Sequence, residues 1–410
     1  MLHLPTLALL TSCVAAAQPV TLDAALARAE AGDPSLLAAG ERLAAARELK
    51  RQAGTWTSNP TLELGYATAA VSGGGDQSAS VTVSQAIPVA GQAGARVREA
   101  ELRIGAAEQA LAARRLLVRA DVTLAFQAAM VARARVALRV QASELAGALA
   151  AVAARLVEAH QVAAIDQLQA DVDKARAEGS LLAAEADLAE AMATLRGRLR
   201  MKEGEPIELA GTMMEGGPVP DVDALVRTAA EARPDIRAVL AGADAEDAAA
   251  DVLGREVWSD LVVGAGWQRD VAAIGSLTGT DDFLVVRLSM PLPVVNRNTG
   301  AISAAHHRAS ASRAEADALR ATVERRIREA AARLAAESKR FGALSAALPT
   351  DEQAAALVRK GYEGGQLRIT DVLAARDRSL RLREDVLDAQ IAVVRARVAL
   401  MRAAGLETLP

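Results

Sequence analysis

The sequence predicts a mainly α-helical protein with a small transmembrane β-barrel contribution, built from two copies of a helix, β-hairpin and helix unit. Three observations predict this fold class. Residues 22–36 resemble residues 222–236, and residues 81–89 resemble residues 286–294, so the chain repeats itself after about 200 residues. Long stretches without proline carry helical spacing of their apolar residues. Four short segments alternate apolar and polar residues with period two, as strands do.

Composition agrees with long helices that pack closely. The chain is 51% hydrophobic but only 2% aromatic, so no large aromatic core is expected. The formal net charge of -4 argues against nucleic acid as a partner. After the N-terminus no run of ~18 consecutive apolar residues occurs, so we expect no transmembrane α-helix.

Residues 1–17 are predicted to be a signal peptide. A short apolar run at 7–14 is followed by three alanines at 15–17, the small-residue pattern that signal peptidase cuts. The segment before the apolar run has no Lys or Arg, so the true start codon is open. Residues 10–13 also fit a lipoprotein cleavage box, in which Cys13 would carry the lipid. Cys13 is the only cysteine, which excludes a disulfide framework and a thiolate metal site.

The first repeat, at 18–210, contains predicted strands at about 61–68 and 79–87, and the second repeat, at 221–410, contains strands at about 260–268 and 282–290. In the first strand Leu62, Leu64 and Tyr66 share one side. Segments of ~9–11 residues with one apolar and one polar face suit a transmembrane β-barrel. Two soluble hairpins packed on helices are the alternative, because periodicity alone does not separate the two.

Four strands cannot close a barrel, because the smallest barrels have about eight. Open edges in lipid would leave backbone groups without hydrogen-bond partners. The chain is therefore expected to oligomerise. A homotrimer would supply about twelve strands, an even number within the allowed range.

Two long helices follow the hairpins. The first is predicted at about 92–157 and the second at about 298–362, where Pro349 should kink or break it. Turns between antiparallel helices, which we call the tips, are expected at about 157–165 and 361–370. A Gly- and Pro-rich linker at 211–220 joins the repeats.

Two segments carry a resemblance to a known family. Residues 291–300 read PLPVVNRNTG, and residues 361–373 read GYEGGQLRITDVL. With these motifs and the duplication, the chain resembles the TolC-type outer-membrane efflux factors over nearly its whole mature length, most closely the heavy-metal branch of CzcC-like and CusC-like proteins. The resemblance implies a trimeric tunnel in the cell outer membrane that extends into the periplasm. It also implies two partners, a periplasmic adaptor (membrane fusion) protein and an inner-membrane pump of the resistance-nodulation-division type.

The second tip has a physical logic of its own. Gly361, Gly364 and Gly365 tolerate positive φ where the chain reverses. The first tip has no glycine. In the family such a small-residue tip contacts the adaptor, so the first tip departs from the pattern.

The resemblance also implies that Asp166 and Asp371 lie near the closed end of the tunnel. In a trimer each would form a ring of three carboxylates that attracts cations and holds hydrogen bonds to Tyr362 or Arg368. We interpret these four residues as a candidate gate. The alternative is that the two aspartates are ordinary helix caps, since Asp is a common cap residue.

No catalytic site is expected. The sequence has no nucleophile with a base, no phosphate loop and no metal cluster, and it implies no cofactor. The adjacent pair His306 and His307 lacks the spacing at which two imidazoles share an ion on a helix, and Met213 and Met214 lie in the linker without a third ligand. The predicted function is passive conduction of solutes, heavy-metal cations foremost, to the exterior. The alternatives are drug or protein export by the same fold, and an exported coiled-coil structural or adaptor protein.

Overall fold

The computed structural model describes residues 19–56, 58–71, 74–202, 205–214, 217–218, 220–274, 277–363 and 366–407. The predicted signal peptide, with Cys13, lies outside these residues, as do Gly364 and Gly365 of the second tip.

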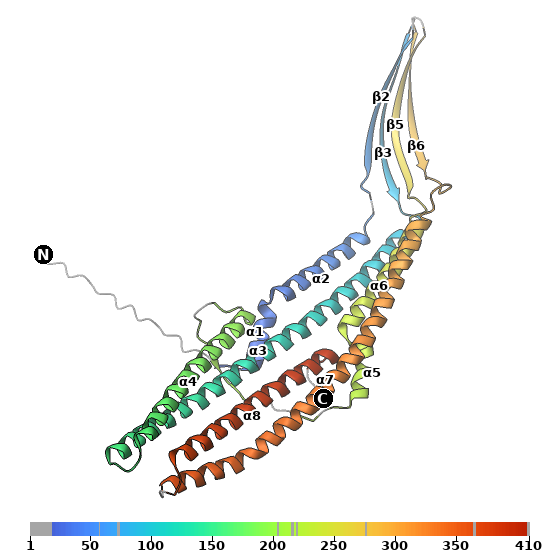
Figure 1. Ribbon diagram of the computed structural model, residues 1–410. Helices are drawn as coiled ribbons and strands as arrows, with labels where there is room; N and C mark the ends of the chain where they lie inside the picture. Colours follow the sequence, from blue (N-terminus) through green and yellow to red (C-terminus); the bar gives the residue numbers. More distant parts are fainter. Residues whose placement is uncertain are drawn as a thin grey trace, which may run out of the picture. The chain divides into compact units, whose positions relative to one another are not determined.

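The chain forms two compact units, each assembled from both sequence repeats (Figure 1). Unit 1 comprises Met1–Pro34, Arg115–Val226 and Arg325–Pro410, and unit 2 comprises Ser35–Arg114 and Arg227–Glu324. Because neither repeat forms a unit alone, the two copies must fold together.

Unit 2 contains one antiparallel sheet of four strands in the order β2-β3-β5-β6. The strands are β2 (Thr61–Val71), β3 (Gly74–Ile87), β5 (Leu261–Ile274) and β6 (Leu277–Ser289). They confirm the four alternating segments, and each runs further toward the hairpin turn than the alternation alone predicts. The two hairpins, one from each repeat, are joined by the pairing of β3 with β5.

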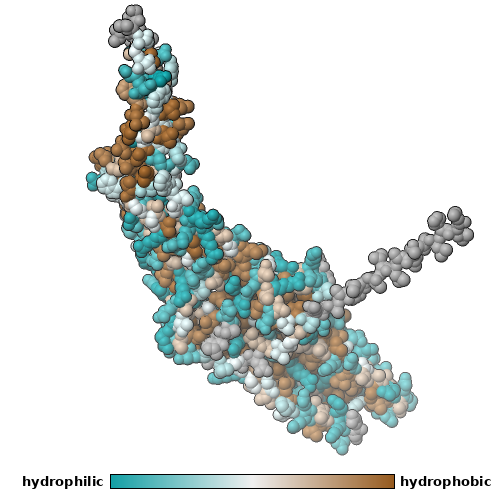
Figure 2. Space-filling model, turned by 180° about the vertical axis from the view of Figure 1, so that it is seen from behind, coloured by the Kyte–Doolittle hydropathy of each residue, from teal (hydrophilic) through white to brown (hydrophobic). Residues whose placement is uncertain are grey.

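The register of the sheet aligns the apolar residues of all four strands. Leu64 pairs with Val81, Val81 with Trp267, and Trp267 with Leu284, so one row crosses the whole sheet. Leu64 and Leu284 are 73% and 83% exposed, so this row is not a core. We call this exposed face the apolar band; in Figure 2 brown, hydrophobic residues gather over the strands.

The opposite face of the sheet is polar and closely packed. Gly266 faces Thr82 there, and a Cβ on Gly266 would come within 2.4 Å of the Val81 carbonyl oxygen. Glu63 of β2 and Arg287 of β6, the two outer strands, form an ion pair of 3.5 Å. A contact between the two outer strands requires the sheet to curl toward its polar face.

Two long helices run on from the hairpins. α3 (Gln92–Glu158) and α7 (Thr299–Glu363) are 67 and 65 residues long, close to the predicted spans. Proline has no amide hydrogen, so Pro349 leaves the Ser345 carbonyl without its helical partner. Of the predicted kink or break, the break does not occur, because α7 is helical on both sides of Pro349 and through it.

Each long helix begins at a polar junction in unit 2. Gln92 is 1% exposed; its amide donates to the Trp258 carbonyl oxygen (2.8 Å) and its Oε1 accepts from the Ala90 amide (2.9 Å). Asn298 precedes α7 with φ of 51° and donates to the Leu253 carbonyl oxygen at 3.4 Å. These hydrogen bonds hold the chain at the two junctions where a strand is followed by a long helix.

Short helices complete the two units: α1 (Leu22–Gly32), α2 (Pro34–Ala53), α5 (Val222–Ala232) and α6 (Pro234–Arg255). A two-residue parallel pair joins β1 (Pro19–Val20) to β4 (Glu208–Leu209), which the sequence does not predict. By length and composition alone, α3 contains a window apolar enough to cross a membrane, contrary to the expectation above. A single such helix is weak support for a span, and Val131 of α3 lies in a protein core.

In unit 1 the long helices continue as two antiparallel pairs, α3 with α4 (Ala164–Arg198) and α7 with α8 (Ile369–Ala404) (Figure 1). Small and β-branched residues allow close approach. One core cluster joins α3 to α8 through Ala120, Val131, Ile391, Val394 and Val398, and Met213 and Met214 of the linker pack against it. Two ion pairs, Arg135 with Asp388 and Arg139 with Glu384, also link α3 to α8.

Candidate functional site

The candidate site is the set of residues at the two tips of unit 1. At the first tip α3 ends at Glu158 and α4 begins at Ala164. His160 takes the left-handed conformation there with φ of 54°, and the Gln161 amide donates to the Leu156 carbonyl oxygen at 2.9 Å. A histidine therefore does what glycine commonly does at a helix C-terminus, which explains how this tip turns without one.

At the second tip Gly361 lies inside α7 rather than in the turn, so its predicted role in positive φ is wrong. Gly361 instead leaves room for a neighbouring side chain, because a Cβ at this position would lie 2.8 Å from Cδ1 of Leu367. The Gln366 amide donates to the Gly361 carbonyl oxygen at 2.8 Å, which closes the turn. A side chain at position 361 would therefore have to displace the Leu367 side chain.

Asp371 caps α8. Its Oδ2 accepts a hydrogen bond of 3.0 Å from the Arg368 amide, the residue that precedes the helix. The Asp371 amide in turn donates to the Arg368 carbonyl oxygen at 3.1 Å. Both side chains are exposed. Within a single protomer Asp371 therefore acts as a helix cap. The cap uses one carboxylate oxygen, so the second oxygen can still face solvent.

Asp166 and Tyr362 are brought together from different repeats. Tyr362 of α7 packs on a cluster that includes Ala153, Ala170 and Ile369. Burial raises the pKa of the Tyr362 hydroxyl, and the negative charge of Asp166 raises it further. The hydroxyl is therefore protonated at neutral pH and available as a hydrogen-bond donor beside an acid.

A buried arginine next to the tips escaped the sequence reasoning. Arg376 of α8 is 9% exposed; its Nη1 donates to Oδ2 of Asp173 on α4, and its Nη2 donates to the Ala142 carbonyl oxygen on α3. Its Nε is buried without a hydrogen-bond partner. One side chain thus links three helices. The only sequence signal of a buried position is the pair of alanines that precedes the arginine, at 374 and 375.

The histidine and methionine pairs do not form a site. Nδ1 of His306, in unit 2, lies 3.0 Å from Oδ1 of Asp247 at the surface. The backbone amide of Met214 donates to Oε1 of Gln127 at 3.0 Å, and the Met214 side chain packs against the core cluster of α3 and α8. Within the described ranges, no cluster of three His, Cys, Asp or Glu side chains could hold a metal ion.

Comparison with known proteins agrees with this geometry. Residues 225–406 match the outer membrane efflux protein family. The chain is similar to the cobalt-zinc-cadmium resistance protein CzcC of Cupriavidus metallidurans, with 28% identity over 366 residues that cover 88% of this chain and 84% of that protein.

Solved structures share the fold over nearly the whole chain. The structure of CusC superposes with a TM-score of 0.73 at 16% identity, covering 94% of this chain and 92% of that one. That of VceC from Vibrio cholerae gives 0.71 at 19% identity, covering 94% and 96%. The open state of the MtrE outer membrane channel of Neisseria gonorrhoeae gives 0.67 at 19% identity, covering 94% and 89%.

Proposed function

We propose, from the premise that this chain is a TolC-type outer-membrane efflux protein, that it forms a passive homotrimeric channel through which a tripartite system exports heavy-metal cations. One observation carries the channel: a curled four-stranded sheet exposes a continuous apolar band to its surroundings. Large exposed apolar surfaces mark contact with lipid or with another protein. An outward apolar face over a polar inner face is the arrangement of a membrane barrel.

The trimer follows from the edges of the sheet. Among the described strands, β2 and β6 each pair on one side only. Because the four strands alternate in direction, β6 of one protomer would lie antiparallel to β2 of the next, and three copies would close a twelve-stranded barrel in lipid.

The tips would close the channel. We infer that Asp371 and Asp166 form carboxylate rings, with Tyr362 and Arg368 available as donors. The partners would be a periplasmic adaptor, docked near Gly364 and Gly365, and an inner-membrane pump of the resistance-nodulation-division type that supplies the energy.

Heavy-metal cations are proposed as cargo because the relative named for cobalt, zinc and cadmium resistance matches along most of both chains. A channel need not bind its cargo tightly, since strong sites slow release. The lack of a metal cluster in the described part of the chain is therefore compatible with this cargo.

Metal sensitivity of a deletion strain, tested metal by metal, examines the cargo. We expect growth inhibition by at least one of cobalt, zinc, cadmium, copper or silver, restored by the parent gene. Sensitivity confined to drugs would instead assign the channel to drug export. Neighbouring genes for an adaptor and a metal pump would support the first outcome.

Two residues on β2 test the membrane face. Leu64 lies on the apolar band and Ala67 on the polar face, so Leu64→Lys and Ala67→Lys place the same charge on opposite sides. A lysine on the lipid face of a barrel costs about 2–4 kcal/mol at mid-membrane. Leu64→Lys should lower the amount of protein in the outer membrane, whereas Ala67→Lys should not. Equal amounts, or extraction of the parent without detergent, would favour a soluble coiled-coil protein.

A further inference from the structure

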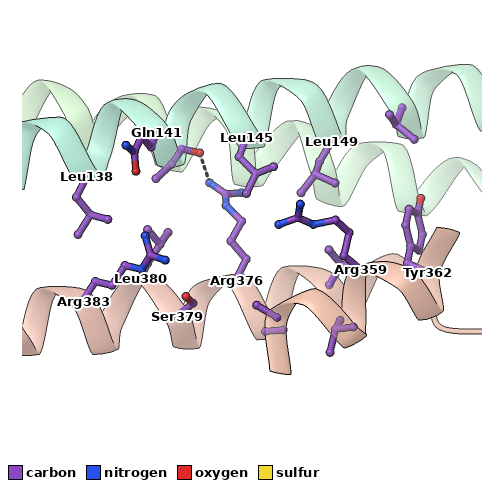
Figure 3. A pocket seen from close by; sticks show the side chains of 16 residues that line it. Leu138, Gln141, Leu145, Leu149, Arg359, Tyr362, Arg376, Ser379, Leu380 and Arg383 are labelled. Atoms are coloured by element: carbon purple, nitrogen blue, oxygen red, sulfur yellow. Dashed lines mark hydrogen bonds between the residues drawn. The ribbon is translucent and has the colours of Figure 1, made fainter. Parts of the chain in front are cut away.

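A cavity of about 400 Å³ opens in unit 1 between α3, α7 and α8, on the side of the helices that carries Arg376 (Figure 3). This volume lies within the range of about 300–1,000 Å³ typical of small-molecule sites. The proposed channel function gives this space no role.

The wall from α3 is an apolar stripe. Leu138, Leu145 and Leu149 line it, spaced so that they fall along one side of the helix. Eleven residues of helix at 1.5 Å each make this wall about 16 Å long. A long, narrow apolar wall fits an extended alkyl chain better than a compact ligand.

The facing helices contribute positive charge. Arg359 of α7 and Arg376 and Arg383 of α8 line the cavity, and no acidic side chain is among its described lining residues. Figure 3 shows these arginines extending into the space that the leucines face. Two of them already have acceptors: Arg383 donates to Glu352 at 3.2 Å, and Arg376 donates to Asp173 and to the Ala142 carbonyl oxygen. Each guanidinium has five N–H donors, so these bonds do not use all of them.

The arginines favour an anion in this part of the cavity. The Nε of Arg376 is buried away from the cavity space, so an oxyanion there would accept hydrogen bonds chiefly from Arg359 and Arg383. Hydrogen bonds to a charged guanidinium are stronger than neutral ones.

We propose that this cavity binds a single-chain anionic amphiphile, with its alkyl chain along the leucines of α3 and its anionic head among the three arginines. A neutral alkyl chain would accept no hydrogen bond from the arginines, and an inorganic anion would leave the leucine stripe in water. A free fatty acid and a monoacyl phospholipid share the required chemistry.

The test is equilibrium binding of radiolabelled dodecanoate to the full-length protein in nanodiscs of neutral phosphatidylcholine. We expect saturable binding of one molecule per protomer, with dodecanol and butanoate competing at least about tenfold more weakly. Competition by a monoacyl phosphatidylglycerol as strong as that by dodecanoate would identify a lipid source, and weaker competition a free fatty acid.

Arg359→Gln removes charge from the cavity without touching the buried contact of Arg376, and it should weaken dodecanoate binding about tenfold. Arg325→Gln, at an exposed arginine elsewhere on α7, is the matched control and should leave binding unchanged. Leu149→Ser should weaken dodecanoate but not the already weak butanoate. Absence of saturable binding, equal binding of dodecanol, or an Arg359→Gln protein that binds like the parent would overturn the proposal.

Discussion

The buried arginine of α8 gives the sharpest prediction. Arg376→Met keeps the length of the side chain but removes both bonds, to Asp173 on α4 and to the Ala142 carbonyl on α3. Breaking a fully buried ion pair by removing one partner costs about 3–5 kcal/mol. The Asp173 side chain is 35% exposed, so water can solvate it, and we expect a smaller loss of about 2 kcal/mol.

Hydrogen exchange measures this loss locally. If α8 is held to its neighbours by Arg376, amides at 369–383 should exchange about thirtyfold faster in Arg376→Met, because 1.4 kcal/mol corresponds to about tenfold in an opening equilibrium. Arg381→Met is the control on the same helix. Arg381 is 73% exposed and pairs with Asp377 on the same helix at 2.6 Å, so its loss should change exchange less than about threefold.

A double-mutant cycle with Asp173→Asn separates the pair from the rest. The two single variants should each speed exchange, and the double variant should add little to the effect of Arg376→Met, since both remove one contact. Exchange in Arg376→Met that matches Arg381→Met would refute the reasoning and leave Arg376 a packing residue.

Four further predictions are independent of this one. Light scattering of the detergent-solubilised protein should give a homotrimer, and a monodisperse monomer would contradict the edge argument. Mass spectrometry should find Gln18 at the mature N-terminus, whereas a diacylglycerol on Cys13 would establish the lipoprotein alternative. Asp371→Asn keeps an acceptor for the helix cap but removes the charge, so it should raise single-channel conductance and weaken block by multivalent cations; an Asn variant that conducts like the parent would make Asp371 a cap alone. Burial raises the pKa of the Asp235 carboxyl, but the hydrogen bonds and charge of Arg233 outweigh burial and lower it. The stabilisation is thus complete above the unfolded value and lost as pH falls through the folded one, so Asp235→Asn should lower the melting temperature at neutral pH, and this effect should shrink progressively as pH falls below about 4.

The sequence predicts those features that repeat locally. Alternation at Leu62, Leu64 and Tyr66 predicts β2, because one side of a membrane strand must be apolar throughout. Helical spacing over more than sixty residues likewise predicts α3 and α7. Pro349 does not break α7, because a long helix packed along its length tolerates the loss of one hydrogen bond.

The features that the sequence hides depend on distant contacts. Arg376 and Asp173 are 203 positions apart, so neither reads as buried until the helices are packed. His160 shows no sign of its left-handed conformation, because only the requirement to reverse the chain imposes it. Gly361 was assigned to the turn from its residue type, whereas its true constraint is the nearby Leu367 side chain.

The two open edges of the sheet have a genetic consequence. β2 and β6 differ in sequence, so each junction in the proposed ring joins one kind of edge to the other. A subunit with a defective β6 edge would still offer an intact β2 edge and would enter rings that it cannot complete. With equal expression and random mixing, only about one ring in eight would contain three normal subunits. Alleles that damage a single edge should therefore be dominant, whereas alleles that prevent folding altogether should be recessive.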